Sequence, residues 1–150
     1  LVGSEMCIRD STYIAGASMG GYGALVHAMK DTEQYRAVGA FSPATVWAKD
    51  LEEKVGHKFP EPMDLYQIIR DDVDAGKKLP DIFFCVGNND FLIESVDRFE
   101  EYLNELKIDH RFDRVDGYEH EWRFWELELP EFLDWLPRTD SYAKMGKHKM

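Results

Sequence analysis

Cysteine is scarce in this sequence of 150 residues, and long hydrophobic runs are absent. The two cysteines, Cys7 and Cys85, are too few for a disulfide scaffold, and their spacing matches no zinc-binding pattern. No apolar run approaches the roughly 18 residues that a membrane-spanning helix needs. We therefore expect a protein of a reducing compartment, the cytoplasm, with no membrane partner.

Basic residues are also in short supply. The chain has 18 Lys and Arg against 29 Asp and Glu, which gives a formal net charge of −11. Binding to a nucleic-acid backbone needs clustered positive charge, so DNA and RNA are not expected partners. The hydrophobic fraction of 44% is typical of a folded domain with a sizeable core.

The two ends of the chain differ from its body. Residues 1–10 (LVGSEMCIRD) show no helix or strand period and resemble the translated read-through of a sequencing adapter. We interpret residues 1–11 as a non-native leader, which would make the chain a fragment whose own leader peptide, if it had one, lies in a missing part. Residues 138–150 are expected to form a solvated tail.

Between these ends, short apolar runs alternate with helical patterns. Strands are predicted at residues 12–17, 36–42, 82–86 and 110–115. Helices are predicted at residues 20–30, 65–75 and about 123–136. A further helix is predicted after the turn at residues 87–90, with Val96, Phe99, Leu103 and Leu106 on one stripe. This alternation implies parallel βαβ units with right-handed crossovers and helices on both faces of the sheet. The predicted fold class is α/β, with one parallel sheet of about four strands and no second domain.

Several residues mark the limits of these elements. Asp64 is a typical N-cap for the second helix, and Gly76 is a typical stop. Pro130 is expected to interrupt or restart the last helix. Residues 44–63 form a mixed connection with two prolines and are a candidate for part of a lid.

The first predicted strand ends in a G-x-S-x-G pattern, Gly16-Ala17-Ser18-Met19-Gly20. A serine raised above a sheet between a strand and a helix occupies a strained turn, and the two glycines are expected to avoid side-chain collisions there. The N-terminus of the following helix directs a positive dipole at Ser18. We predict that Ser18 is a nucleophile in a turn built by Gly16 and Gly20.

A serine nucleophile needs a base, and His120 is the best placed of the five histidines. It lies in the loop after the last predicted strand, at the carboxyl edge of the sheet where Ser18 also lies. The others lie in a helix, in the charged connection, at the start of a strand and in the tail: His27, His57, His110 and His148. His120 is not part of an H-E-x-x-H zinc motif, because Phe124 stands in the place of the second histidine.

The acid that orients the base is predicted to be Asp90, which closes the turn after the third strand. Asp116, nearer to His120 in the sequence, and Glu94, one helical turn past Asp90, remain alternatives. The order serine, aspartate, histidine is the one that α/β-hydrolases use.

Four motifs carry a resemblance to a known family: GASMGG, FSPA, VGNNDFLIES and GYEHEWRFW. Over residues 12–137 the chain resembles the C-terminal half of the putative-esterase family of α/β-hydrolases, which includes tributyrin-type esterases, S-formylglutathione hydrolases and feruloyl esterases. The resemblance implies a partial α/β-hydrolase fold with its front half missing. It also implies ester or thioester hydrolysis without cofactor or metal, with Ser18, Asp90 and His120 as the triad and Trp122 and Trp125 as possible pocket residues.

The predicted reaction is hydrolysis of a small-molecule ester through an acyl-enzyme. The backbone N–H of Met19 is expected to hold the oxyanion. A second donor would lie in the missing half, so we expect the fragment to be weakly active or inactive. We also expect an unpaired edge on the strand that precedes Ser18. An acyltransferase of the same fold and a noncatalytic module that binds carbohydrate or protein remain alternatives. The sequence gives no oligomeric state.

Overall fold

A computed structural model describes residues 12–46, 56 and 64–138 of the chain. Four parallel strands form one sheet in the order β1-β2-β3-β4. The strands are β1 (Tyr13–Ala17), β2 (Ala37–Phe41), β3 (Asp81–Gly87) and β4 (His110–Val115). The helices are α1 (Met19–Lys30), α3 (Leu65–Asp74), α4 (Ile93–Glu105) and α5 (Trp122–Trp135). The predicted α/β class and the four strands are confirmed.

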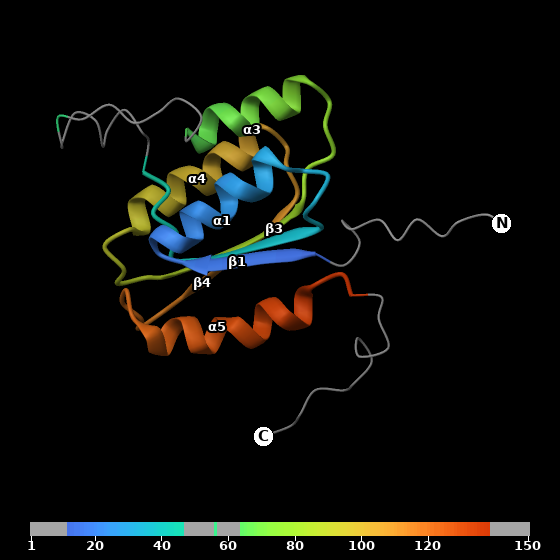
Figure 1. The fold of residues 1–150 in the computed structure, drawn as a ribbon. Coiled ribbons are helices and arrows are strands. Elements are labelled where there is room, and N and C mark those ends of the chain that lie inside the picture. The colour runs from blue at the N-terminus through green and yellow to red at the C-terminus, as the bar shows by residue number, and fades with distance from the viewer. Residues whose placement is uncertain (1–11, 47–55, 57–63, 139–150) are drawn as a thin grey trace.

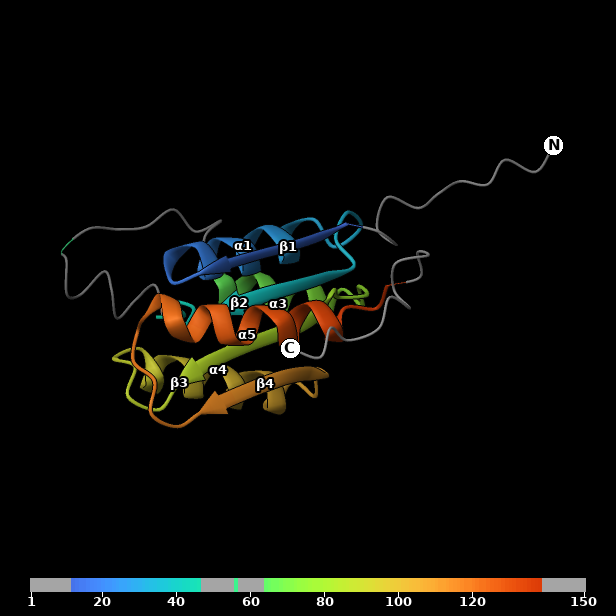
Figure 2. The same ribbon diagram turned by 90° about the horizontal axis from the view of Figure 1, so that it is seen from below.

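The helices form two layers, one on each face of the sheet. Figures 1 and 2 show α1, α3 and α4 together on one face and α5 alone on the other. Each strand pairs with the one before it, so all three crossovers step across the sheet in the same direction. Right-handed crossovers in one direction place their helices on one face. Of the described helices, only α5, which follows the last strand, is left to cover the opposite face.

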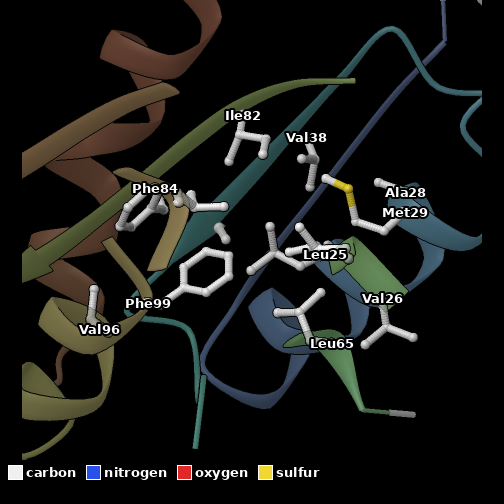
Figure 3. Packing of buried hydrophobic residues seen from close by; sticks show 14 of the residues in the cluster. Leu25, Val26, Ala28, Met29, Val38, Leu65, Ile82, Phe84, Val96 and Phe99 are labelled. Carbon is white, nitrogen blue, oxygen red and sulfur yellow. The ribbon is translucent and has the colours of Figure 1, made fainter. Parts of the chain in front are cut away.

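Alternation along the strands divides the core between these faces. On β3, Ile82, Phe84 and Val86 point into the larger cluster with α1, α3 and α4, while Phe83 and Cys85 point to the α5 side. Figure 3 shows the larger cluster, where Phe84 lies next to Phe99 of α4, with the ring centroids 5.4 Å apart. All of these strand residues are buried, as predicted for a strand covered on both faces.

The helix α5 packs closely on its side of the sheet. Its buried side chains Phe124, Glu128 and Phe132 recur at four-residue intervals and so lie on one face of the helix. A Cβ on Gly39 of β2 would lie 2.7 Å from the Phe132 ring, so the glycine makes room for that ring. A buried glutamate therefore lies in the middle of the apolar face of α5.

Pro130 lies inside α5 and does not interrupt it, so the prediction of a break was wrong. A proline removes one hydrogen bond of the helix, but the helix continues because residues on both sides of it are fixed by packing, with Glu128 and Phe132 both buried.

The other predicted limits are confirmed where the structure describes them. Asp64 caps α3 by accepting hydrogen bonds from the backbone N–H groups of Tyr66 and Gln67, at 3.1 and 3.2 Å. Gly76 follows the end of α3 with a φ of +66°. The interpretations of residues 1–11 as a leader and of the tail from residue 139 fall outside the described residues, as does most of the proposed lid. Of the described helices, none has the length and apolar character needed to span a membrane.

Candidate active site

Three side chains that are far apart in the sequence meet at the carboxyl edge of the sheet. The His120 Nε2 atom lies 2.9 Å from the Ser18 Oγ atom. The Nδ1 atom of the same ring lies 2.9 Å and 3.1 Å from the two carboxylate oxygens of Asp90. The structure thus brings together the serine, the histidine and the aspartate that the sequence analysis selected. Figure 1 shows the shared edge at the arrowheads of the strands.

Ser18 is raised above the sheet by a strained turn between β1 and α1. Its φ of 55° and ψ of −123° lie outside the favoured regions for a residue with a side chain. Three hydrogen bonds fix this turn. The Ser18 N–H donates to the Phe41 carbonyl at 2.8 Å, and the Ser18 carbonyl accepts from the N–H groups of Tyr22 at 3.1 Å and Ala44 at 3.2 Å. Gly16 is needed here, because a Cβ on it would lie 2.3 Å from the Gly20 carbonyl oxygen.

The second glycine of the motif does not have the predicted role. A Cβ on Gly20 would meet no atom within 4 Å, so the expected collision is wrong for this residue. The close approach is between Gly16 and the carbonyl group of Gly20, whereas a side chain on Gly20 would extend into open space. Gly21, next along the helix, is the tighter position, since its Cβ would lie 3.0 Å from the Gly16 oxygen.

Asp90 is fixed before it meets the histidine. Its side chain is fully buried. Its backbone N–H donates to the Gly87 carbonyl at 3.0 Å, and its Oδ1 accepts from the Leu92 N–H at 2.9 Å. A buried carboxylate with fixed oxygens can hold an imidazole in one tautomer and stabilise its protonated form.

The alternative acids and bases lie elsewhere. Asp116 is exposed and accepts a hydrogen bond from the Asn88 side chain, while Glu94 is exposed in the first turn of α4. His27 is exposed on α1, and the His110 Nδ1 lies 2.8 Å from the Ile108 carbonyl. His57 and His148 lie outside the described residues. Of the candidates that the structure describes, only His120 contacts the serine, and only Asp90 contacts the His120 ring through a carboxylate.

The loop that carries His120 is tied to the loop that carries Asp90. The Asn89 N–H donates to the Tyr118 carbonyl at 3.0 Å. A Cβ on Gly87 would lie 2.3 Å from that same carbonyl oxygen, so a glycine is needed for the two loops to meet. The sequence analysis missed this role of Gly87, although the glycine stands in the quoted motif VGNNDFLIES.

The predicted oxyanion donor and pocket residues surround this arrangement. Met19 is the first residue of α1, and the first N–H groups of a helix have no partner within it. The Trp125 ring contacts the His120 ring at a centroid distance of 5.1 Å, and Trp122 contacts Trp125 at 5.0 Å. Trp122 is 74% exposed, so it lies at the rim of the site. A further aromatic ring, Phe91, contacts His120 at 4.7 Å, and the sequence analysis did not select it.

The described residues contain no group of three or more His, Cys, Asp or Glu side chains able to hold a metal ion. The arrangement that is present can move a proton from the serine hydroxyl to the imidazole, which activates the oxygen as a nucleophile. That chemistry suits attack on a carbonyl carbon.

Sequence comparison finds relatives of this chain among esterases. Residues 1–136 match the family described as "Putative esterase". An acetyl esterase from Caldicellulosiruptor saccharolyticus is 26% identical over 152 residues, which cover 89% of this chain and 57% of that protein.

Solved structures show the same fold. An S-formylglutathione hydrolase from Staphylococcus aureus superposes with a TM-score of 0.71 at 23% identity, covering 89% of this chain and 54% of that one. A fluorophosphonate-binding serine hydrolase from the same organism superposes with a TM-score of 0.73 at 22% identity, covering 86% of this chain and 55% of that one. The chain therefore spans about half the length of the relatives it matches.

Proposed function

The chain belongs to the putative esterase family, whose structures have the α/β-hydrolase fold, and on that premise we propose that it carries the catalytic triad of a serine carboxylesterase. Ser18 is the nucleophile, His120 the general base and Asp90 the acid that orients it. The observation that supports this most is the pair of contacts at His120, one ring nitrogen on the serine hydroxyl and the other on a buried carboxylate.

The reaction begins with proton transfer from the Ser18 hydroxyl to His120 Nε2. The serine oxygen forms a bond to the ester carbonyl carbon, and the carbonyl oxygen takes up the negative charge. The charge on that oxygen is stabilised by the backbone N–H of Met19. The bond to the alcohol breaks as His120 returns the proton to the departing oxygen. Water then repeats the sequence on the acyl-enzyme and releases the acid.

The substrate class that we propose is a small-acyl carboxylic ester. The name of the acetyl esterase relative supports a short acyl group. Thioester hydrolysis follows the same steps, because only the leaving group differs. A second oxyanion donor, expected from the front half of the family's fold, is worth about 10²–10³ in turnover, so we expect the 150-residue chain alone to hydrolyse esters slowly.

Two separate assays of the 150-residue chain test the proposal. One is covalent labelling with a fluorophosphonate, which reacts with activated serines, and the other is hydrolysis of p-nitrophenyl acetate. Ser18→Ala is expected to abolish labelling. Asp90→Asn is expected to lower the labelling rate by about 10³–10⁴-fold, because the imidazole loses the partner that fixes its tautomer. Mass spectrometry of the labelled peptide should place the adduct on Ser18.

A matched control is His27→Gln, because His27 is exposed on α1 and away from the strand ends. It should label at the wild-type rate, whereas His120→Gln should not label. Labelling that persists in a folded Ser18→Ala variant, or an unlabelled wild-type chain, would contradict the proposal and favour a noncatalytic binding module.

A further inference from the structure

The imidazole of His120 needs support beyond its two polar contacts. His120 lies in the loop between β4 and α5, where no strand pairing fixes the backbone. In the proposed reaction, its contact with Ser18 is lost once the serine is acylated. Asp90 alone would then hold a ring that must stay aligned for the water step, and misplacement by about 1 Å can cost 10²-fold in rate.

Within the described part of the chain, two aromatic rings contact His120, and they differ in how firmly they are held. Phe91 lies 4.7 Å from the imidazole but is 76% exposed. Trp125 lies 5.1 Å away at an interplanar angle of 87°, and its Nε1–H donates to the Ser42 Oγ atom at 3.1 Å. Trp125 is therefore the ring with a polar anchor.

The anchor is itself rigid. Ser42 directly follows β2 and is fully buried. Its N–H donates to the Cys85 carbonyl of β3 at 2.8 Å, and its φ of 43° is a left-handed conformation that a residue with a side chain rarely adopts. Such strain persists only where the surroundings fix the backbone. The indole is thus attached to the end of β2 rather than to a loop.

We propose that Trp125 is a positioning residue for His120: its indole, hydrogen-bonded to Ser42, forms a fixed wall that keeps the imidazole between Asp90 and Ser18 through both halves of the reaction. This inference rests on the proposed esterase function. Ser42 acts through Trp125 and touches neither the base nor the substrate. The four strand ends then each contribute one part: the nucleophile, the anchor, the acid and the base.

The first experiment measures fluorophosphonate labelling of the 150-residue chain as two quantities, the maximal inactivation rate and the inhibitor concentration at half that rate. Trp125→Ala should lower the maximal rate about 10²-fold with little change in the concentration term. Trp125→Phe keeps an aromatic wall without its anchor and should lower the rate about 10-fold. A pocket role alone would instead change the concentration term.

The second experiment tests the anchor. Ser42→Gly removes the hydroxyl, and glycine adopts a positive φ without strain, so the backbone should not suffer. It should lower the maximal rate about as much as Trp125→Phe. The double variant Ser42→Gly with Trp125→Phe should be no slower than either single variant, because both remove the same hydrogen bond. Effects that simply multiply would overturn the role of Ser42.

A spectroscopic readout separates this inference from the proposed function. The His120 Nδ1–H bonded to the Asp90 carboxylate should give a downfield proton resonance, which Trp125→Ala should broaden or abolish as the ring loses its alignment. Trp135→Phe, which changes an indole at the far end of the same helix, should leave the resonance and the labelling unchanged. An unchanged resonance in folded Trp125→Ala would overturn the inference even if wild-type labelling failed. If Trp125→Ala does not fold, the maximal labelling rates of Trp125→Phe and Ser42→Gly test the inference, and wild-type rates in both variants would overturn it.

Discussion

The turn at Ser18 can form only where the space beside its glycines allows the backbone to approach closely. The space beside Gly16 is filled by the Gly20 carbonyl, whereas the space beside Gly20 is open. The two glycines of the same motif therefore have different physical roles, and a substitution distinguishes them.

Gly16→Ala should destabilise the chain by roughly 1–3 kcal/mol, the usual cost of inserting a methyl group into a filled space. Gly20→Ala should leave stability unchanged or raise it by up to about 1 kcal/mol, since alanine is favoured over glycine in a helix. Urea unfolding followed by circular dichroism measures both. Equal losses in the two variants would show that the turn needs flexibility rather than space.

Some residues of the site could be predicted from the sequence, and others could not. Ser18, Asp90 and His120 could be selected because each lies in the turn or loop that follows a predicted strand, and parallel strand ends share an edge. Ser42 is the last residue of a predicted strand, within the motif FSPA, but its role depends on an indole 83 positions later. No local pattern encodes such a contact.

At the scale of one element, α5 carries a buried acid against the sheet. Burial raises the pKa of Glu128 to about 7, and the nearby carboxylates of Asp113 and Glu131 act in the same direction. The Arg111 guanidinium, which binds both of those carboxylates, only partly offsets this. Three carboxyl groups share one cation, so the buried one favours its proton. The charge of Glu128, after burial itself, also raises the pKa of the Cys85 thiol.

This arrangement predicts a stability that depends on pH. Glutamate in the unfolded chain has a pKa of about 4.3. With a folded pKa of about 7, Glu128 binds a proton more tightly when the chain is folded. The contribution of protonated Glu128 to the free energy of unfolding is therefore fully present below about pH 4.3. It is lost as the pH rises through 7 and does not change further above that pH. Glu128→Gln should be more stable than wild type at pH 8, by on the order of 1–3 kcal/mol, and similar to it near pH 4.5.

Unfolding midpoints in urea between pH 4.5 and 8 give the measurement. The matched control is Glu126→Gln, an exposed position on the same helix, which should follow the wild-type profile within about 0.5 kcal/mol. If the Glu128→Gln profile stays parallel to that of wild type, the acid is ionised throughout and the account of α5 is wrong.

The elements themselves were largely readable from the sequence. Continuous apolar runs such as Ile82–Val86 correspond to a strand buried on both faces, and Asp64 and Gly76 limit α3 as expected. Pro130 was misread because a proline is judged by its local cost, while the continuity of α5 depends on the sheet beneath it. Glu128 stands within the apolar stripe of this helix, but its burial depends on the sheet that α5 covers.

At the scale of the whole molecule, the two edges of the described sheet differ. The edge strand β4 carries the charged residues Arg111, Asp113 and Arg114, which discourage pairing with another sheet. The strand β1 (YIAGA) at the opposite edge of the described sheet has no charge and is partly exposed. An uncharged, apolar edge is prone to pair with another chain.

We therefore expect the 150-residue chain to self-associate through β1 as its concentration rises. Ala15→Lys places a charge at an exposed position of that strand and should shift the chain toward monomer. Sedimentation velocity over a range of concentrations measures the shift, with Ala15→Gln as an uncharged control of similar length. Association that is equal in the lysine variant would place the contact elsewhere.

The uniform direction of the crossovers has one more consequence. Each βαβ step adds one strand end to the same edge, and the hydrogen bond between Ser18 and His120 joins residues 102 positions apart. Contacts of such long sequence separation form late, after most of the loop-closure entropy has been lost. The reactivity of the Ser18 hydroxyl should therefore report the completion of refolding, because it should appear only once all four strands are in register.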